Sequence, residues 1–223
     1  MNEQIDPSLS LKKNKKKTRV AIFGGSFDPP TIAHMQIACE IYNNFENIDQ
    51  VWLVPCGDGR SDKKLRTSAS DRLSMLHLIK DDLIAPNVPI YIDETEVNRG
   101  EYVPTYFLLK ELTEKHKDKE FIFCIGTDLL GGLKTWDECE KLVDEFEFII
   151  TSREDYPLVL DQPDVVYPKN YIVLNTIISG SSTKIRNRIH SRIETKINLA
   201  INGLTTNRVI KYIQEHKLYS IEY

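Results

Sequence analysis

The chain has 223 residues, a formal net charge of −4 and a sequence pI of about 5.8. The length allows one large domain with a sizeable core, and the acidic balance argues against nucleic acid as a partner, which would require a basic field. Because no apolar run reaches bilayer-spanning length and the N-terminus lacks the apolar core of a signal peptide, we expect a soluble, cytoplasmic protein without membrane contact.

Residues 1–17, which end in KKNKKK, carry a block of like charge that cannot be buried. We expect them to form a disordered, solvated tail. A lysine block can also serve as a nuclear address, so nuclear access is the alternative. The remaining residues, 18–223, are predicted to form a single domain.

From Arg19 onward, short β-rich apolar runs alternate with longer stretches of helical spacing. This alternation predicts an α/β fold, a Rossmann-like doubly wound parallel sheet. Helical spacing appears at Met35, Ala38 and Tyr42, at residues 73–79, and at 106–112. The expected strands are residues 20–23, 51–54, 90–92, 121–125, 146–150 and 172–174.

The last fifty residues have a different pattern, because SSTKIRNRI and RVIKYIQEHKLY indicate helices with no further strand. They predict a small C-terminal helical cap, at about residues 180–223. The four cysteines are far apart and lack the spacing of a zinc site, so we expect reduced, mostly buried thiols and no protein-held metal. A redox pair assembled by folding is the alternative.

The stretch GGSFDPPTIAH follows the first expected strand, at the sheet edge where ligands of parallel α/β proteins bind. Backbone N–H groups and the positive end of a helix dipole attract phosphate there, and Gly24 and Gly25 let the backbone approach closely. Thr31 is a suitable N-cap, and His34 in the first helical turn can meet a phosphate oxygen as an imidazolium. Neither the dinucleotide fingerprint nor a P-loop is present. An ordinary strand-to-helix turn with a capping histidine is the alternative.

A second cluster, GSSTKIR at residues 180–186, pairs hydroxyls with cations. Ser182 or Thr183 can cap a helix whose free N–H groups face a phosphate, while Lys184 and Arg186 supply positive charge. An amphipathic helix with a serine cap and a solvent-facing arginine is the alternative.

The ordered set GGSFDPP, T-x-x-H, I-G-T-D, a tryptophan and S-S-T-x-x-R resembles the nicotinate mononucleotide adenylyltransferases of the nucleotidylyltransferase superfamily. The resemblance runs from about residue 20 to 219. It implies adenylyl transfer from ATP to nicotinate mononucleotide, giving nicotinate adenine dinucleotide and pyrophosphate in NAD biosynthesis, with Mg²⁺ bridging the ATP phosphates. The residues it implies for catalysis are His34, Arg186 and Thr31. Those it implies for ATP and phosphate binding are Gly24, Gly25, Ser26, Phe27, Lys63, Lys64, Gly126, Asp128, Ser181, Ser182 and Thr183.

The same resemblance assigns Thr105, Trp136 and Arg153 to the pyridine mononucleotide, with Trp136 stacking on the ring. It favours nicotinate over nicotinamide, because the segment near Thr105 offers backbone donors to a carboxylate. Without it, Asp128 reads as a helix N-cap and Trp136 as core filling.

Two residues depart from the family pattern H-x-G-H. Thr31 replaces the first histidine and cannot carry positive charge, and Ala33 replaces the glycine, adding a methyl group where adenine approaches bare backbone. Phosphopantetheine adenylyltransferases carry threonine at the first position and are the rival enzyme. A nucleotide-binding module of the same fold that has lost turnover is the non-enzymatic alternative.

Overall fold

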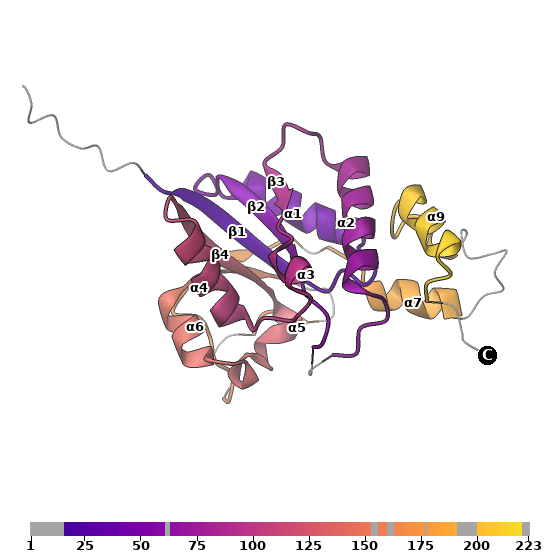
Figure 1. Ribbon diagram of the computed structural model, residues 1–223. Coiled ribbons are helices and arrows are strands. Elements are labelled where there is room, and N and C mark those ends of the chain that lie inside the picture. Colours follow the sequence, from indigo (N-terminus) through magenta and orange to yellow (C-terminus); the bar gives the residue numbers. More distant parts are fainter. Residues whose placement is uncertain are drawn as a thin grey trace, which may run out of the picture.

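The computed structural model describes residues 16–60, 63–152, 156–159, 163–176, 178–190 and 200–219. A central sheet carries helices on both faces, and further helices lie beside one end of it (Figure 1). None of the helices in this part of the chain has the length and apolar composition needed to cross a bilayer. The predicted disordered tail falls almost wholly on residues 1–15, outside the described residues.

Six parallel strands form the sheet, in the order β3-β2-β1-β4-β5-β6. Strand order reverses between the central strands β1 and β4, which is the doubly wound, Rossmann-like arrangement that the sequence predicts. Each predicted strand is confirmed, with ends that differ by a few residues at most. The strands are β1 (Thr18–Gly25), β2 (Gln50–Pro55), β3 (Ile90–Ile92), β4 (Lys119–Gly126), β5 (Glu147–Thr151) and β6 (Asn170–Leu174).

The helices fall where the spacing predicts them, with additional short turns between β3 and β5. They are α1 (Ile32–Asn44), α2 (Ala69–Leu83), α3 (Thr95–Arg99), α4 (Thr105–Lys115), α5 (Thr127–Leu130), the 3₁₀ turn η1 (Leu133–Thr135), α6 (Cys139–Glu145), α7 (Ser182–His190) and α9 (Asn207–Glu215). The C-terminal helical cap is confirmed, but its last helix is shorter than RVIKYIQEHKLY suggests. The chain leaves helical geometry after Glu215 and adopts a φ of 52° at Lys217 and 61° at Tyr219.

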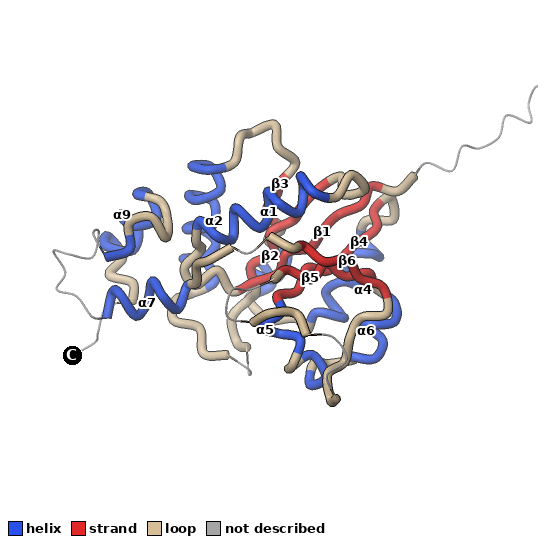
Figure 2. Tube along the Cα trace, turned by 180° about the vertical axis from the view of Figure 1, so that it is seen from behind, coloured by secondary structure: helices blue, strands red, loops and turns tan. Residues whose placement is uncertain are grey.

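Two apolar layers cover the sheet, because successive side chains of a strand point to opposite faces. Ala21 and Phe23 of β1 face the layer that contains α1, α2 and the C-terminal helices, whereas Val20 and Ile22 face the layer formed by α4 and α6. Figure 2 shows the two groups of helices on either side of the strands. The cysteines are unpaired thiols, three of them buried and Cys39 partly buried, as predicted.

The sheet opens at the point where the strand order reverses. Residue pairing between β1 and β2 continues to Gly25 opposite Pro55, whereas pairing between β1 and β4 runs only as far as Ile22 opposite Phe123. The carboxyl ends of β1 and β4 therefore separate, and ligands of doubly wound sheets bind in such a crevice. The fold thus places the residues after Gly25 at its main ligand site.

Candidate active site

The turn after β1 is held by donors from distant parts of the chain. The backbone N–H of Cys56 donates to the Gly25 carbonyl at 3.0 Å, and Nη1 of Arg72 donates to the Ser26 carbonyl at 2.9 Å. In a trans peptide the N–H points opposite to the C=O. The N–H group of Ser26 is therefore directed away from β2, toward the opening beside β4, and that of Phe27 is directed away from α2. This orientation suits a bound anion.

The start of α1 fixes the imidazole of His34. Thr31 is the N-cap, as predicted, and its backbone N–H donates to His34 Nδ1 at 2.9 Å, while the two side chains meet at 2.8 Å. Because a backbone N–H can only donate, Nδ1 accepts, and the ring carries its proton on Nε2. In this arrangement His34 is a neutral Nε2–H donor, not the imidazolium that the sequence suggested.

Thr31 itself has no face toward solvent, since only 1% of its surface is exposed. Its side chain is turned to His34, so its role is to position the imidazole. Phe27 is buried to the same extent and packs edge-on against the His34 ring at 5.0 Å between centroids. Phe27 was predicted to bind phosphate. Because its ring is buried against His34, only its backbone is available to contact a ligand. A Cβ atom at Gly25 would lie 3.2 Å from that ring, which explains a glycine there.

The start of α7 contacts the same turn. Ser181 is the residue that caps this helix, because its hydroxyl accepts from the backbone N–H of Lys184 at 3.2 Å. The prediction that Ser182 or Thr183 is the cap is therefore wrong. The hydroxyl of Ser182 instead donates to the Pro29 carbonyl at 2.7 Å, which ties α7 to the turn after β1.

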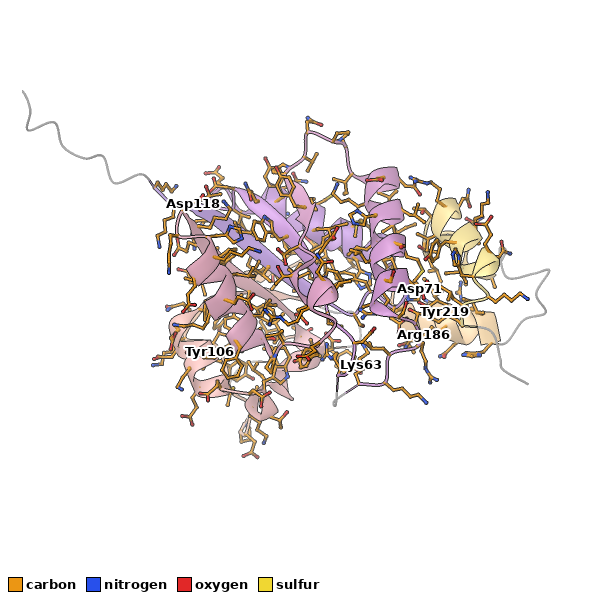
Figure 3. The ribbon with its side chains drawn as sticks, viewed as in Figure 1. Lys63, Asp71, Tyr106, Asp118, Arg186 and Tyr219 are labelled. Atoms are coloured by element: carbon orange, nitrogen blue, oxygen red, sulfur yellow. The ribbon has the colours of Figure 1, made fainter. Side chains whose placement is uncertain are left out.

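Arg186 makes the second connection between these segments. Its Nη1 donates to the Asp28 carbonyl at 2.6 Å, across 158 residues of sequence, and its Nη2 donates to the Thr183 hydroxyl at 2.9 Å. The two clusters singled out in the sequence thus lie in contact. Lys63, Arg186 and Tyr219 are labelled at this junction in Figure 3, where α7 meets the loop before α2.

The methyl group of Ala33 packs against Gly180, just before α7. A Cβ atom at Gly180 would lie 3.0 Å from the Ala33 Cβ, closer than side chains tolerate, and Gly180 has a φ of 144°. The absence of a side chain at Gly180 therefore accommodates the methyl group that Ala33 adds.

Lys63 reaches the turn from the loop between β2 and α2. Its Nζ donates to the Ser26 hydroxyl at 3.0 Å. Partial desolvation of this ammonium, with the nearby Arg60 and Arg186, holds its pKa below that of an ordinary lysine. Both predicted lysines, Lys63 and Lys64, are otherwise exposed residues of the loop. Lys63, Arg60 and Arg186 converge on one place, and in the described part of the chain no carboxylate forms an ion pair with Lys63. Such a place favours a polyanion.

We expect triphosphate binding to weaken when Lys63 loses its proton. Because the pKa of Lys63 is lowered, this loss of affinity should begin at a lower pH than it would for an ordinary lysine. A bound polyanion raises the pKa of Lys63 toward its normal value, so affinity is fully present below the free protein's pKa and is lost as pH rises through it. We expect the Kd for ATP to rise on the alkaline side in wild type and to be flat there in Lys63→Gln. Lys115→Gln, exposed at the far end of α4, is the control and should keep the wild-type profile. A pH profile of the ATP Kd in Lys63→Gln that equals the wild-type profile would show that Lys63 does not bind the triphosphate.

Asp28 connects three segments through one buried carboxylate, only 2% exposed. It accepts from the backbone N–H of Arg66 at 2.7 Å, the hydroxyl of Thr67 at 2.9 Å and the hydroxyl of Tyr219 at 2.7 Å. Burial, and then the charge of Asp28, raises the pKa of the Tyr219 phenol far above its usual range, so it remains a donor. The C-terminal cap is thereby fastened to the turn after β1.

The residues predicted for the ribose and pyridine lie around the end of β4. Gly126 ends β4, and Asp128 is exposed in the first turn of α5; Gly126 is the N-cap residue of that helix, so Asp128 is not its cap. Trp136 is half-buried and meets Phe123 edge-on at 6.1 Å between centroids, while Thr105 begins α4. Gly126 and Asp128 thus lie at the carboxyl end of β4, where the sheet opens, and Trp136 packs on a residue of the same strand. Arg153 lies outside the described residues.

Sequence reasoning missed two buried charged residues next to the site, Arg72 and Glu96. Arg72 shares the buried stripe of α2 with Met75, Leu76 and Ile79, and a charged residue within an apolar helical stripe is a signal that could have identified it. Glu96 and the partners of Asp28 carry no such signal, because their contacts are made across loops.

A doubly wound sheet whose reversal point holds two helix starts, a histidine donor and convergent cations defines a nucleotide-binding enzyme of the nucleotidyltransferase class. The chain belongs to the Cytidylyltransferase-like family, whose sequence model matches residues 22–188. Within that family it belongs to the nicotinate-nucleotide adenylyltransferases.

Relatives in sequence and in structure agree on this branch. A probable nicotinate-nucleotide adenylyltransferase of Oceanobacillus iheyensis is 30% identical over 200 residues, which cover 90% of this chain and 96% of the relative. The structure of Plasmodium falciparum nicotinic acid mononucleotide adenylyltransferase complexed with NaAD matches with a TM-score of 0.73 at 29% identity, over 91% of this chain and 97% of that one. The same Plasmodium enzyme complexed with APC matches with a TM-score of 0.69 at 28% identity, over 91% and 97%.

Proposed function

We propose that the protein transfers the adenylyl group of ATP to nicotinate mononucleotide, forming nicotinate adenine dinucleotide and releasing pyrophosphate. The observation that carries this proposal is the direct contact between the two phosphate-type clusters, through Arg186 on Asp28 and Ser182 on Pro29. The named activity of the relatives, and the NaAD bound to the Plasmodium structure, support the same substrates.

The chemical step needs placement more than covalent catalysis. An oxygen of the mononucleotide's 5′-phosphate is already ionised, so it attacks the α-phosphorus without a general base. A new P–O bond forms, the bond from the α-phosphorus to the bridging oxygen of the β-phosphate breaks, and pyrophosphate leaves with the electron pair. His34 donates from Nε2 to an oxygen of the α- or β-phosphate, where negative charge accumulates.

The positive groups of the loop and of α7 receive the triphosphate tail. Arg186 and Lys63 lie against the turn after β1, and the N–H groups of that turn are directed into the opening. Both cations stabilise the leaving pyrophosphate. Ser182 donates its only hydroxyl proton to Pro29, so it supports the turn, and Ser181 caps the helix whose N-terminus faces the ligand.

Mg²⁺ is proposed to enter as the complex with ATP, as part of the substrate. Among the described residues, no group of three or more histidine, cysteine or acidic side chains is placed to hold a metal ion. The one buried carboxylate at the turn, Asp28, already accepts three hydrogen bonds. Such a donor set fits a cation coordinated chiefly by phosphate oxygens, which Mg²⁺ prefers, and the ion would supply charge neutralisation to those phosphates.

The pyridine end is proposed to lie near α4 and η1. Trp136 offers a partly exposed aromatic face beside the end of β4, suited to stacking on a flat ring. The backbone N–H and the hydroxyl of Thr105, at the first turn of α4, offer donors to the nicotinate carboxylate. The segment that contains Gly126 and Asp128 is assigned to the adenosine ribose, because the carboxylate of Asp128 can accept hydrogen bonds from the ribose hydroxyls.

Pyrophosphate release tests the proposal. With ATP, Mg²⁺ and nicotinate mononucleotide, we expect stoichiometric pyrophosphate and nicotinate adenine dinucleotide, with slower reaction on nicotinamide mononucleotide. Phosphopantetheine in the same assay tests the rival enzyme and should give no pyrophosphate. Binding of ATP without release would show a non-catalytic nucleotide-binding module and would overturn the proposed activity.

A further inference from the structure

Arg72 carries a fully buried guanidinium from α2 into the space between two loops. Its Nη1 donates to the Ser26 carbonyl at 2.9 Å, and its Nη2 donates to the Cys56 carbonyl at 2.7 Å. The same Nη2 meets Asp58 at 3.1 Å, whose side chain is 48% exposed. Most of its contacts are thus to backbone carbonyls after β1 and after β2. A guanidinium is one of the few groups that can bind two peptide carbonyls at once from a fixed fork.

Glu96 approaches the same stretch of backbone from the opposite side. It is 4% exposed, and one carboxylate oxygen accepts from the N–H of Gly57 at 3.1 Å and from the N–H of Val103 at 3.2 Å. Val103 lies two residues before Thr105, in the segment proposed to read the pyridine carboxylate. Glu96 therefore connects the loop after β2 to the pyridine side of the site.

The backbone between these two side chains has no freedom to move toward its neighbours. A Cβ atom at Gly57 would lie 2.1 Å from the carbonyl oxygen of Glu101, so only glycine fits. Arg72 holds the carbonyl before Gly57, and Glu96 holds the N–H of Gly57, so the Cys56–Gly57 peptide is fixed at both of its polar groups.

We infer that Arg72 and Glu96 are positioning residues: through the Cys56–Gly57 peptide they hold the ATP-side turn at Ser26 and the pyridine-side segment at Val103 in fixed relation. The inference rests on the proposed function, which places the two substrates on these two segments. Neither side chain touches substrate. Both are polar side chains at buried positions, and each binds backbone groups of two separate segments with its polar atoms.

The rate of adenylyl transfer is expected to depend on this connection more than substrate binding does. In Arg72→Lys a single ammonium replaces the fork and cannot span both carbonyls, so the two nucleotides bind but lie slightly apart from the reactive arrangement. We expect kcat to fall about 30-fold, while the Kd values of a non-hydrolysable ATP analogue and of nicotinate mononucleotide, each measured alone, change less than about threefold. Arg19→Lys, a largely buried arginine at the opposite end of β1, is the matched control and should keep kcat.

Glu96 offers a rescue test. Glu96→Ala leaves two buried N–H groups without an acceptor, and we expect kcat to fall about 30-fold, with a KM increase for nicotinate mononucleotide but not for ATP. Glu96→Gln keeps a carbonyl oxygen for both donors and should restore kcat to within about threefold of wild type. Glu96→Gln as slow as Glu96→Ala, or a kcat in folded Arg72→Lys within twofold of wild type, would overturn the inference.

Amide hydrogen exchange separates this inference from the proposed function. We expect the Gly57 and Val103 amides to exchange faster in Glu96→Ala and to recover protection in Glu96→Gln, whatever reaction the protein performs. If the wild-type protein releases no pyrophosphate, the proposed function fails, and with it the assigned consequence for kcat, while the exchange result still decides whether Glu96 holds the two segments. Unchanged exchange in Glu96→Ala would show that it does not.

Discussion

His34→Ala is expected to lower kcat by roughly two to three orders of magnitude, the effect of removing one preorganised donor from a site where phosphate charge develops. Binding of nicotinate mononucleotide should change little, because Nε2 of His34 is assigned to an oxygen of ATP. The measurement is pyrophosphate release under saturating substrates, together with the Kd of the mononucleotide. A variant with unchanged turnover would refute the role given to this histidine.

The same substitution also removes part of a helix cap, so its control must separate stability from chemistry. The His34 ring accepts the N–H of Thr31 in the position that glutamine or glutamate occupies in an ordinary capping box. His34→Gln and His34→Glu should therefore both retain thermal stability better than His34→Ala. Their turnover should differ, because glutamine keeps an N–H donor and glutamate sets a negative charge against the phosphates. Equal turnover in these two variants would mean that the site holds no phosphate beside residue 34.

Asp28→Ala is expected to lower the free energy of unfolding by about 3–5 kcal/mol, because it leaves Arg66, Thr67 and Tyr219 without their shared acceptor. The loss detaches the C-terminal cap and the loop before α2 from the turn after β1, so we also expect activity to disappear at temperatures where the sheet is still folded. Urea denaturation and activity as functions of temperature measure the two effects.

Asp28→Asn is the matched variant. Its amide oxygen can still accept from the Arg66 N–H, and its NH₂ group can face the hydroxyls of Thr67 and Tyr219, which are able to accept. We expect a loss of about 1–2 kcal/mol, well below that of Asp28→Ala. Equal losses in the two variants would show that the negative charge is what this position requires, and a negligible loss in Asp28→Ala would show that the three contacts do not stabilise the fold.

The parts of the fold that depend on local pattern were predictable from the sequence. The strands read as continuous apolar runs because both faces of the sheet are covered, and the order of strand, glycine pair and capped helix identifies the turn after β1. Thr31 as N-cap follows from the residues beside it. The family resemblance then related this turn to the distant Ser-Ser-Thr cluster, and the bonds of Arg186 and Ser182 confirm that the two clusters meet.

The parts that depend on long-range contact were not predictable in the same way. Ser181, Ser182 and Thr183 could each cap a helix. Only the position of the Pro29 carbonyl determines that Ser182 donates to it and that Ser181 caps α7. The protonation of His34 follows from the direction of one backbone N–H. Glu96 and Tyr219 lie in stretches without a motif, and each has a partner far away along the chain, Gly57 for Glu96 and Asp28 for Tyr219.

A crystal structure of the wild-type protein with a non-hydrolysable ATP analogue and nicotinate mononucleotide tests the central claim most directly. We predict one nucleotide with an α- or β-phosphate oxygen about 3 Å from His34 Nε2 and a terminal phosphate oxygen within hydrogen-bond distance of Arg186. A structure in which these two side chains contact different ligands, or in which the triphosphate lies away from the turn after β1, would contradict it.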